Sequence, residues 1–145
     1  METPKYLKHK PIISVNNYGK IDGKFSNETD AEALSIGFAQ YDKTDMSVKV
    51  WRYDKTNEKW SRQSEELPLH RVLDLSILTI ASFIKNTESD FPISNLMETY
   101  DDIKNAKEIQ KYYENNKAKI KPRITELERL IKEFRKIENE NYSNL

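Results

Sequence analysis

The chain has 145 residues, of which 37% are hydrophobic and 33% charged, and its formal net charge is zero. This length fits one domain with a buried core, and the neutral total argues against nucleic acid or an acidic membrane as a partner. The absence of cysteine excludes disulfides and thiolate catalysis. A metal site would have to combine carboxylates with the two histidines, so we expect neither metal nor cofactor.

Two features indicate a cytoplasmic protein. Residues 1–15 contain no apolar core of signal-peptide length. The longest apolar run, residues 67–84, contains His70, Arg71 and Asp74, which favours a buried helix over a membrane span.

The first half of the chain carries turn and strand signals. Residues 1–10 are basic and we expect them to be flexible, whereas residues 11–66 form the β-rich part. Residues 11–15 predict a short strand, and residues 16–30 are rich in turn formers. Residues 29–32 resemble a helix capping box, but the alternation that follows favours a strand.

Two alternating segments predict a β-hairpin. Apolar side chains occupy the even positions of residues 34–38 and again of residues 46–50. Both sets reach one face only if the connecting loop has odd length, and a loop of three or five residues near Thr44 would fit. We expect this shared face to be the core, which leaves Trp51 and Tyr53 on the outer face.

A third strand is predicted for residues 59–64, with two alternatives for Trp60. A four-residue loop before this strand would place Trp60 beside Trp51 on the outer face, whereas a loop of three or five residues would place it in the core. The sequence leaves both alternatives open.

Residues 67–86 predict the central helix of the fold, with Pro68 at the first helical position. The apolar side chains of this helix cover more than half of its circumference, so we expect it to be buried on most sides. A small sheet cannot provide that much cover, which predicts burial against further helices or a second copy of the chain.

Residues 94–141 predict a C-terminal helical hairpin. The first helix begins at Asn95, a break follows at residues 114–117, and Pro122 starts the second helix. In the second helix, apolar residues recur with the spacing of a coiled coil, at Ile124, Leu127, Ile131 and Phe134. We expect the hairpin to pack on the domain or to pair across a dimer.

Together these signals predict an α+β fold in a single domain, residues 1–145. A small antiparallel sheet of three or four strands would pack on the buried central helix, and the helical hairpin would follow. A homo-oligomer, most simply a dimer, would complete the cover of the helices.

The block WSRQSEELPLHRVLDL, residues 60–75, resembles a small family of uncharacterised bacterial and phage proteins. Residues 10–12, 33–41 and 48–52 extend the resemblance, which covers residues 10–84 and omits the C-terminal helices. The resemblance implies a bacterial or phage origin and assigns no catalytic or binding residue. Small conflict proteins of such origin often sequester a nucleotide signal or bind an enzyme, which is an analogy of architecture only.

An aromatic floor is the first candidate binding site. Trp51 and Tyr53 share the predicted outer face with Tyr41 and with the small residues Gly37 and Ala39, so a base or sugar could stack there. The alternative is that the C-terminal helices cover this face and the aromatic residues form a second core.

Arginine is the basis of the second candidate site, because its guanidinium binds phosphate or carboxylate with two hydrogen bonds. The strands and the central helix contain Arg52, Arg62 and Arg71. Gln63 and Ser64 would join them near the helix amino terminus at Pro68, whose free N–H groups favour an anion. The alternative is that Glu65 and Glu66, which stand at the same place, already neutralise the arginines.

His70 and Asp74 are the third candidate, since residues four apart share one helix face. With Ser61 or Ser64 they would make a Ser-His-Asp hydrolase, but neither serine lies on a sharp turn. The favoured interpretation of His70 and Asp74 is a structural pair that ties the helix to the sheet. A metal site is not expected, because these two residues would be its only ligands.

Residues 104–123 carry seven basic and two acidic side chains, with Tyr112 and Tyr113 among them. Such a run can contact nucleic acid or an acidic partner, but a solvated helix face is its usual meaning. The neutral total favours the solvated face.

We therefore predict a binding protein and not an enzyme. The first hypothesis is capture of an anionic, nucleotide-like small ligand. Its ligand site would consist of Trp51, Arg52, Tyr53, Trp60, Arg62, Gln63, Ser64, His70, Arg71 and Asp74. The alternative is a protein–protein interaction module, such as an immunity or inhibitor protein, that acts through the sheet face or the helical hairpin. A hydrolase that uses His70 is the third hypothesis.

Overall fold

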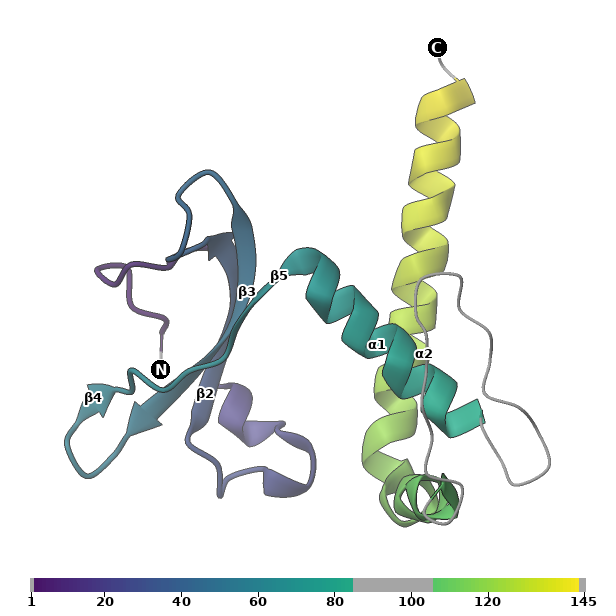
Figure 1. Cartoon of the computed structure of the whole chain (residues 1–145), viewed down its shortest axis with the longest axis horizontal. Helices are drawn as coiled ribbons and strands as arrows, with labels where there is room; N and C mark the ends of the chain where they lie inside the picture. Colours follow the sequence, from purple (N-terminus) through teal and green to yellow (C-terminus); the bar gives the residue numbers. More distant parts are fainter. Residues whose placement is uncertain (1, 85–105, 144–145) are drawn as a thin grey trace. The chain divides into compact units, whose positions relative to one another are not determined.

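The computed structural model describes residues 2–84 and 106–143. By their internal contacts the residues fall into two compact units, 1–84 and 85–145. Figure 1 shows the elements, which are β1 (Lys10–Asn16), the 3₁₀ turns η1 (Tyr18–Lys20) and η2 (Gly23–Phe25), β2 (Ala31–Phe38), β3 (Met46–Asp54), β4 (Lys59–Trp60), β5 (Glu66–Pro68), α1 (Leu69–Ile84) and α2 (Ala106–Ser143). The single domain expected over residues 1–145 stays a prediction.

The strands form one antiparallel sheet, which confirms the α+β class with one strand more than expected. β1, β2 and β3 follow one another in space as they do in the chain. β4 and β5 share the remaining edge of β3, where β4 pairs with Tyr53 and Asp54 and β5 pairs with residues 47–49. The predicted third strand over residues 59–64 is therefore shorter than expected, and Pro68 belongs to a strand instead of a helix.

The pairing of β2 with β3 confirms that the hairpin loop has odd length. Phe38 lies opposite Met46, so residues 39–45 connect the strands, and this loop is longer than predicted. Leu34 pairs with Val50, which places the even-numbered apolar side chains on one face, as expected. The strand alternative for residues 31–38 is confirmed as well.

The buried face of the sheet is the one opposite to the face expected. Trp51 is 1% exposed and Ser47 is fully buried, whereas Val48 and Val50 are only half-buried. The cover comes in part from the start of the chain, because His9 is itself buried. Thr3 and Pro4 are buried as well, so this segment helps to make the face of Trp51 the interior, while the flexibility expected of residues 1–10 stays a prediction.

Gly37 lets this first segment lie close to the sheet. In the pairing of β1 with β2, Gly37 lies opposite Pro11, and the backbone of Lys10 passes directly over it. A Cβ atom at position 37 would collide with the carbonyl oxygen of Lys10. Glycine is therefore required at this close approach of two backbones.

α1 is not the buried central helix that the sequence predicted. It begins at Leu69, directly after β5, and Figure 1 shows it leaving the sheet there. Ala81 is its one buried residue, and Leu73 is 63% exposed. Because no loop separates β5 from α1, the helix cannot turn back onto the sheet that precedes it.

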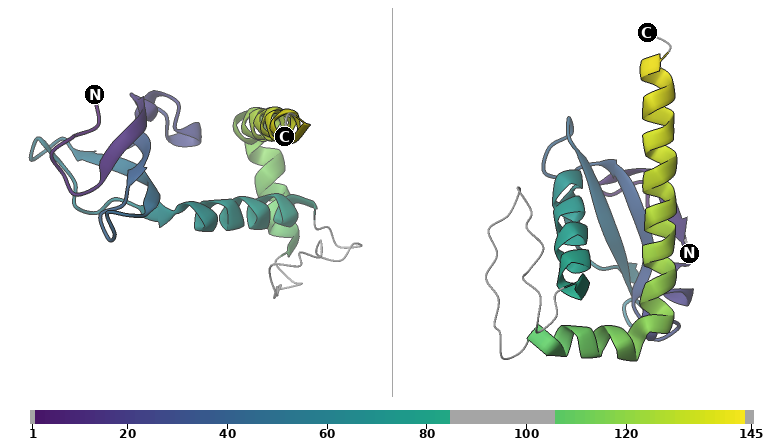
Figure 2. Two further views of the ribbon diagram at one scale, coloured as in Figure 1. Left: turned by 90° about the horizontal axis from the view of Figure 1, so that it is seen from above. Right: turned by 90° about the vertical axis from the view of Figure 1, so that its right-hand side faces the viewer.

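α2 replaces the expected hairpin by one long helix in the described residues. Residues 114–117 are helical instead of a break, and Pro122 lies inside the helix instead of at its start. Figure 2 shows a bend in the amino-terminal half of α2, as expected where proline removes a backbone hydrogen bond. Residues 95–105 of the predicted first hairpin helix lie outside the described residues. Across both described ranges, no helix has the length and apolar character that crossing a bilayer requires.

Candidate functional site

The interior face of the sheet is lined by small and polar residues around one large aromatic side chain. Ala31, Ala33 and Ser35 of β2 alternate inward, and Ser47, Lys49 and Trp51 of β3 lie on the same side. The ring of Trp51 contacts the rings of His9 and Trp60 edge to face, at centroid distances of 5.7 and 5.8 Å. This face is therefore closed.

A hydrogen-bond network centred on His9 holds this interior together. His9 Nδ1 lies 3.0 Å from Ser47 Oγ and 3.2 Å from Glu66 Oε1, and His9 Nε2 lies 3.0 Å from Ser35 Oγ. The Ser47 hydroxyl donates to Glu66 Oε1 at 2.6 Å, and the Trp51 indole N–H donates to Ser35 Oγ at 2.8 Å. The network joins the first segment of the chain to β2, β3 and β5.

The donors in the network determine its protonation. Because Ser35 Oγ accepts the indole N–H of Trp51, its own hydroxyl can donate to Nε2 of a neutral His9, whose Nδ1–H then donates to Glu66. Burial lowers the pKa of His9 and outweighs the opposing hydrogen bond to Glu66. Burial disfavours the Glu66 carboxylate, but hydrogen bonds from Ser47, the Gln40 N–H and His9 together lower the pKa of Glu66.

The order Ser35, His9 and Glu66 matches that of a serine hydrolase triad, but the surroundings do not. His9 is fully buried and Ser35 is 7% exposed. Ser35 also lies in the middle of β2 and not on a sharp turn. A substrate cannot reach these groups in the structure, so the network is a structural core made of polar residues.

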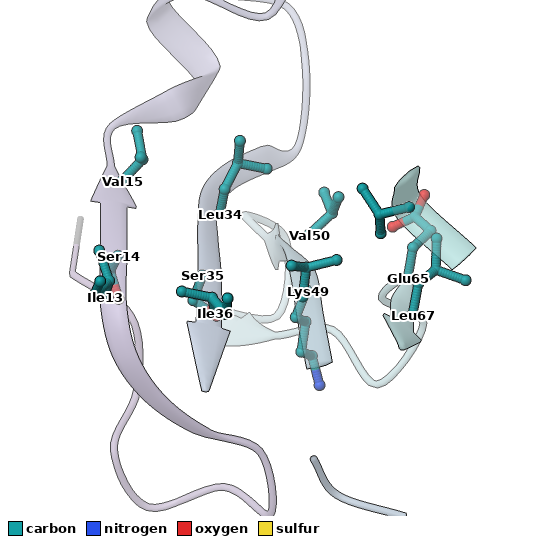
Figure 3. Close-up of a pocket in the computed structure, with 12 residues that line it drawn as sticks. Ile13, Ser14, Val15, Leu34, Ser35, Ile36, Lys49, Val50, Glu65 and Leu67 are labelled. Carbon is teal, nitrogen blue, oxygen red and sulfur yellow. The ribbon is translucent and has the colours of Figure 1, made fainter. Parts of the chain in front are cut away.

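The opposite face of the sheet carries an open apolar hollow. Figure 3 shows its side chains, which come from three neighbouring strands and from the segment around β5. The hollow measures about 380 Å³, and its apolar lining consists of Ile13, Val15, Leu34, Ile36, Val48, Val50, Leu67 and Val72. Glu65 stands at its rim. This arrangement, which we call the open face, can bury the apolar groups of another molecule.

The predicted aromatic floor lies on the closed face. Trp51 is buried, and Trp60 covers it from β4 while also contacting Tyr53 at a centroid distance of 5.4 Å. Residues 55–58 form the four-residue loop that places Trp60 on the side of Trp51, so that alternative is the observed one. The side of the sheet that carries Trp51 is therefore its interior. This resembles the second aromatic core that was the alternative to a binding site, except that the start of the chain and Trp60 help to cover it.

The predicted arginine site is divided among separate positions. Arg52 binds Glu65 with two hydrogen bonds, at 3.1 and 2.6 Å, and also pairs with Asp30. The hydrogen bonds that Arg52 donates to Glu65 and Asp30 raise the pKa of Arg52, and Arg52 in turn lowers the pKa of Glu65. Arg62 and Arg71 are exposed. Arg52 is thus neutralised by Glu65, as the alternative proposed, and by Asp30, whereas Glu66 binds His9 and Ser47 instead of an arginine.

The remaining predicted residues lie on the surface or are half-buried. Gln63 is exposed, Ser64 is half-buried, and both precede β5 in an irregular segment. His70 is exposed on α1, and across the described residues no hydrogen bond or ion pair links it to Asp74. The part of the chain that the structure describes contains no cluster of three potential metal ligands. In the described part of the basic run, Lys111 and Lys117 pair with glutamates of the same helix.

The sequence analysis missed the groups that close the interior. His9 lies in a segment without periodicity, so no pattern assigns it to the core. The one available signal was the run of small residues at odd positions from Ala31 to Ala39, along β2 and directly after it. Small side chains on one face allow a backbone segment to lie directly on a sheet.

Comparison with known proteins places most of the chain in a described group. A family model matches residues 1–98, and its description reads "Family of unknown function (DUF6530)". This match confirms the resemblance to an uncharacterised family and covers the whole sheet and α1. No curated protein matches the chain. No solved structure matches it either.

Proposed function

Because the chain belongs to the DUF6530 family, whose function is unknown, we propose a function from its own geometry. We propose that it is a non-enzymatic protein-binding module, which holds an amphipathic helix of a partner protein against the open face of its sheet. This is the interaction module that the sequence offered as its alternative hypothesis.

The observation that carries this proposal is the contrast between the two faces. The closed face is built from alanine, serine and a buried network, whereas the larger aliphatic side chains of β2 and β3 line the open face. Burying a fully exposed aliphatic side chain contributes about 1.5–3 kcal/mol. Most side chains that line the hollow are already half-buried, so a partner that fills it gains only part of this free energy at each of them, less the cost of association.

A helix fits the open face better than an extended segment. The neighbouring strands β1, β2 and β3, with β5 beside them, are spaced about 4.8 Å apart, and their combined width accommodates one helix of about 10 Å diameter. Helices are also the usual cover of an apolar sheet face in α+β proteins. α1 does not supply this cover, since Val72 in its first turn is the one residue of α1 that lines the hollow.

The nucleotide-like ligand and the His70 hydrolase stay hypotheses with less support. Trp51, the proposed stacking surface, is enclosed, and Arg52 is engaged by two carboxylates. His70 lacks an acidic partner among the described residues. Thermal melting with a panel of nucleotides tests the first of these, because a ligand that binds only the folded state raises the melting temperature.

Ile36→Lys tests the proposed function, since it places a charge in the lining of the open face. Affinity purification from the cells that encode the protein should enrich a partner with the unmodified bait. We expect at least about a tenfold loss of that partner with Ile36→Lys, which corresponds to 1.4 kcal/mol. Quantitative mass spectrometry measures the enrichment.

Ile12→Lys is the matched control. It introduces the same charge on the exposed edge strand β1, at a residue that is outside the hollow. We expect this variant to retain the partner and both variants to keep the far-ultraviolet circular dichroism of the parent. A partner retained equally by Ile36→Lys contradicts the proposal, and so does unfolding of that variant, because unfolding means that the chain itself covers the face.

A further inference from the structure

α2 carries an apolar stripe that continues through several turns. Its residues follow the alternating three- and four-residue spacing of a heptad repeat, at Ile120, Ile124, Leu127, Ile131 and Phe134. These side chains remain partly or largely exposed, and Phe134 is 58% exposed. Leu130 and Ile137 widen the stripe on one side and are about half-exposed.

The other faces of α2 are already stabilised by its own charges. Glu126 pairs with Arg129, Glu128 with Lys132, and Glu138 with Arg135, each three or four residues apart. Such pairs contribute only about 0.2–0.5 kcal/mol each, and they leave the apolar stripe in water. A long helix of this kind gains most of its stability when the stripe is buried.

We infer that α2 pairs with α2 of a second copy of the chain as a parallel, two-stranded coiled coil. In the part of α2 that follows Pro122, Ile124 and Ile131 take the a positions and Leu127 and Phe134 take the d positions. Among parallel coiled coils, β-branched residues at a with leucine at d favour two strands over three or four. The pattern at positions 124, 127 and 131 therefore favours a pair of helices, and the parallel direction rests on the flanking charges at positions 123 and 128.

The flanking residues agree with this register. Arg123 takes a g position and Glu128 the following e position, where opposite charges attract across a parallel pair. Pro122 takes an f position, on the side of the helix that faces away from the partner. The proline therefore bends α2 without placing its ring in the seam. This inference is independent of the proposed function, since it uses no residue of the sheet.

A single introduced cysteine tests the pairing, because the full chain contains no cysteine. In a parallel dimer each d residue meets its own copy, so Leu127→Cys should form a disulfide-linked dimer under mild oxidation. Thr125→Cys is the control at an exposed b position, on the side away from the seam. We expect at least about a tenfold faster cross-linking for Leu127→Cys, and sedimentation equilibrium of the unmodified chain should give twice the mass of one chain.

Ile131→Asp, added to Leu127→Cys, places a charge in the neighbouring a layer and should slow cross-linking to the rate of the control. Helicity is monitored by circular dichroism to confirm that the chain still folds. A monomeric mass at high micromolar concentration overturns the inference, as does a trimer or tetramer. Equal cross-linking of Leu127→Cys and Thr125→Cys also overturns it, and so does an antiparallel pair, recognised when Leu127→Cys links only to Ile131→Cys.

Discussion

At the scale of single residues, His9 holds the interior of the sheet unit closed. It bonds to Ser35, Ser47 and Glu66, which lie on three different strands. A buried polar group that loses its partner costs about 1–3 kcal/mol, so each of these side chains depends on the others. Among the described residues, Glu66 Oε2 is a buried atom with no hydrogen-bond partner. The network is therefore sensitive to changes of protonation.

The first prediction at this scale concerns pH. The pKa of His9 is lowered in the folded protein, so as pH falls below about 6.5 the unfolded chain binds a proton that the folded chain refuses. The free energy of unfolding should fall by up to about 1.4 kcal/mol per pH unit until the folded pKa is reached, and stay constant above 7.5. Urea unfolding at several pH values measures this slope.

The second histidine provides the matched control for this experiment. Between about pH 6.5 and 4.5, His9→Gln should remove the slope, whereas His70→Gln, which changes an exposed side chain outside the network, should leave it in place. The lowered pKa of Glu66 contributes separately, and its share of the stability is lost as pH falls below about 4.5. A slope that disappears with His70→Gln, or persists with His9→Gln, would refute the assignment.

The sequence showed which residues share a face but could not show which face is covered. Alternation and the odd loop follow from local geometry, and both were predicted correctly for β2 and β3. The even-numbered aliphatic side chains of β2 and β3 were predicted to form the core, because apolar side chains are usually buried. The cover of the other face comes from His9 and Trp60, which reach it through contacts distant in sequence. No local pattern contains that information.

At the scale of elements, α1 and α2 depart from prediction for related reasons. The sequence predicts that helices start at Pro68 and Pro122, because proline is favoured at the first helical position. Pro68 instead ends β5, and Pro122 lies within α2. A long helix can tolerate the lost hydrogen bond and bend, whereas propensity alone predicts a boundary.

Pro122→Ala should straighten α2 and stabilise it. Alanine restores a backbone N–H that can donate to the carbonyl of Ala118, and proline in a helix interior costs about 3 kcal/mol. Spin labels on Lys111→Cys and Lys136→Cys report the bend, because a straight helix separates these Cα atoms by about 37 Å. We expect a longer distance in the Pro122→Ala background than with proline present.

Dilution of the labelled chain with unlabelled chain removes signals between two copies. Circular dichroism should also show a higher melting temperature for α2 in the Pro122→Ala variant. An unchanged distance distribution would mean that the bend has a cause other than the proline.

At the scale of the whole molecule, the two units have different relations to the family. The matched region, residues 1–98, contains the entire sheet and α1, and α2 lies outside it. The open face therefore belongs to the part that defines the family, whereas the proposed pairing helix belongs to the part that does not. Binding and pairing can accordingly be tested by substitutions in separate units.

A dimer joined through α2 would carry two open faces. On a surface that displays the partner at high density, the second contact is intramolecular and raises the apparent affinity by about 10²–10⁴-fold. Ile131→Asp should remove this gain and leave the affinity for free partner in solution unchanged. Surface plasmon resonance measures the first affinity with the partner immobilised and the second with the chain immobilised. An equal loss of both affinities in Ile131→Asp would mean that the substitution damages the binding face itself and does not act through pairing.

The position of His9 also determines the order in which the sheet unit can form. His9 and Glu66 lie 57 residues apart, whereas β2 and β3 are joined by residues 39–45 alone. Contacts between neighbouring strands close small loops and form early, and those between distant residues form late. The growing chain can bring His9 to Ser35 and Ser47 once β3 has been made, but the Glu66 carboxylate that completes the network arrives only with β5. Until then the edge of β3 that β5 will occupy is unpaired, and an unpaired strand edge is open to aggregation.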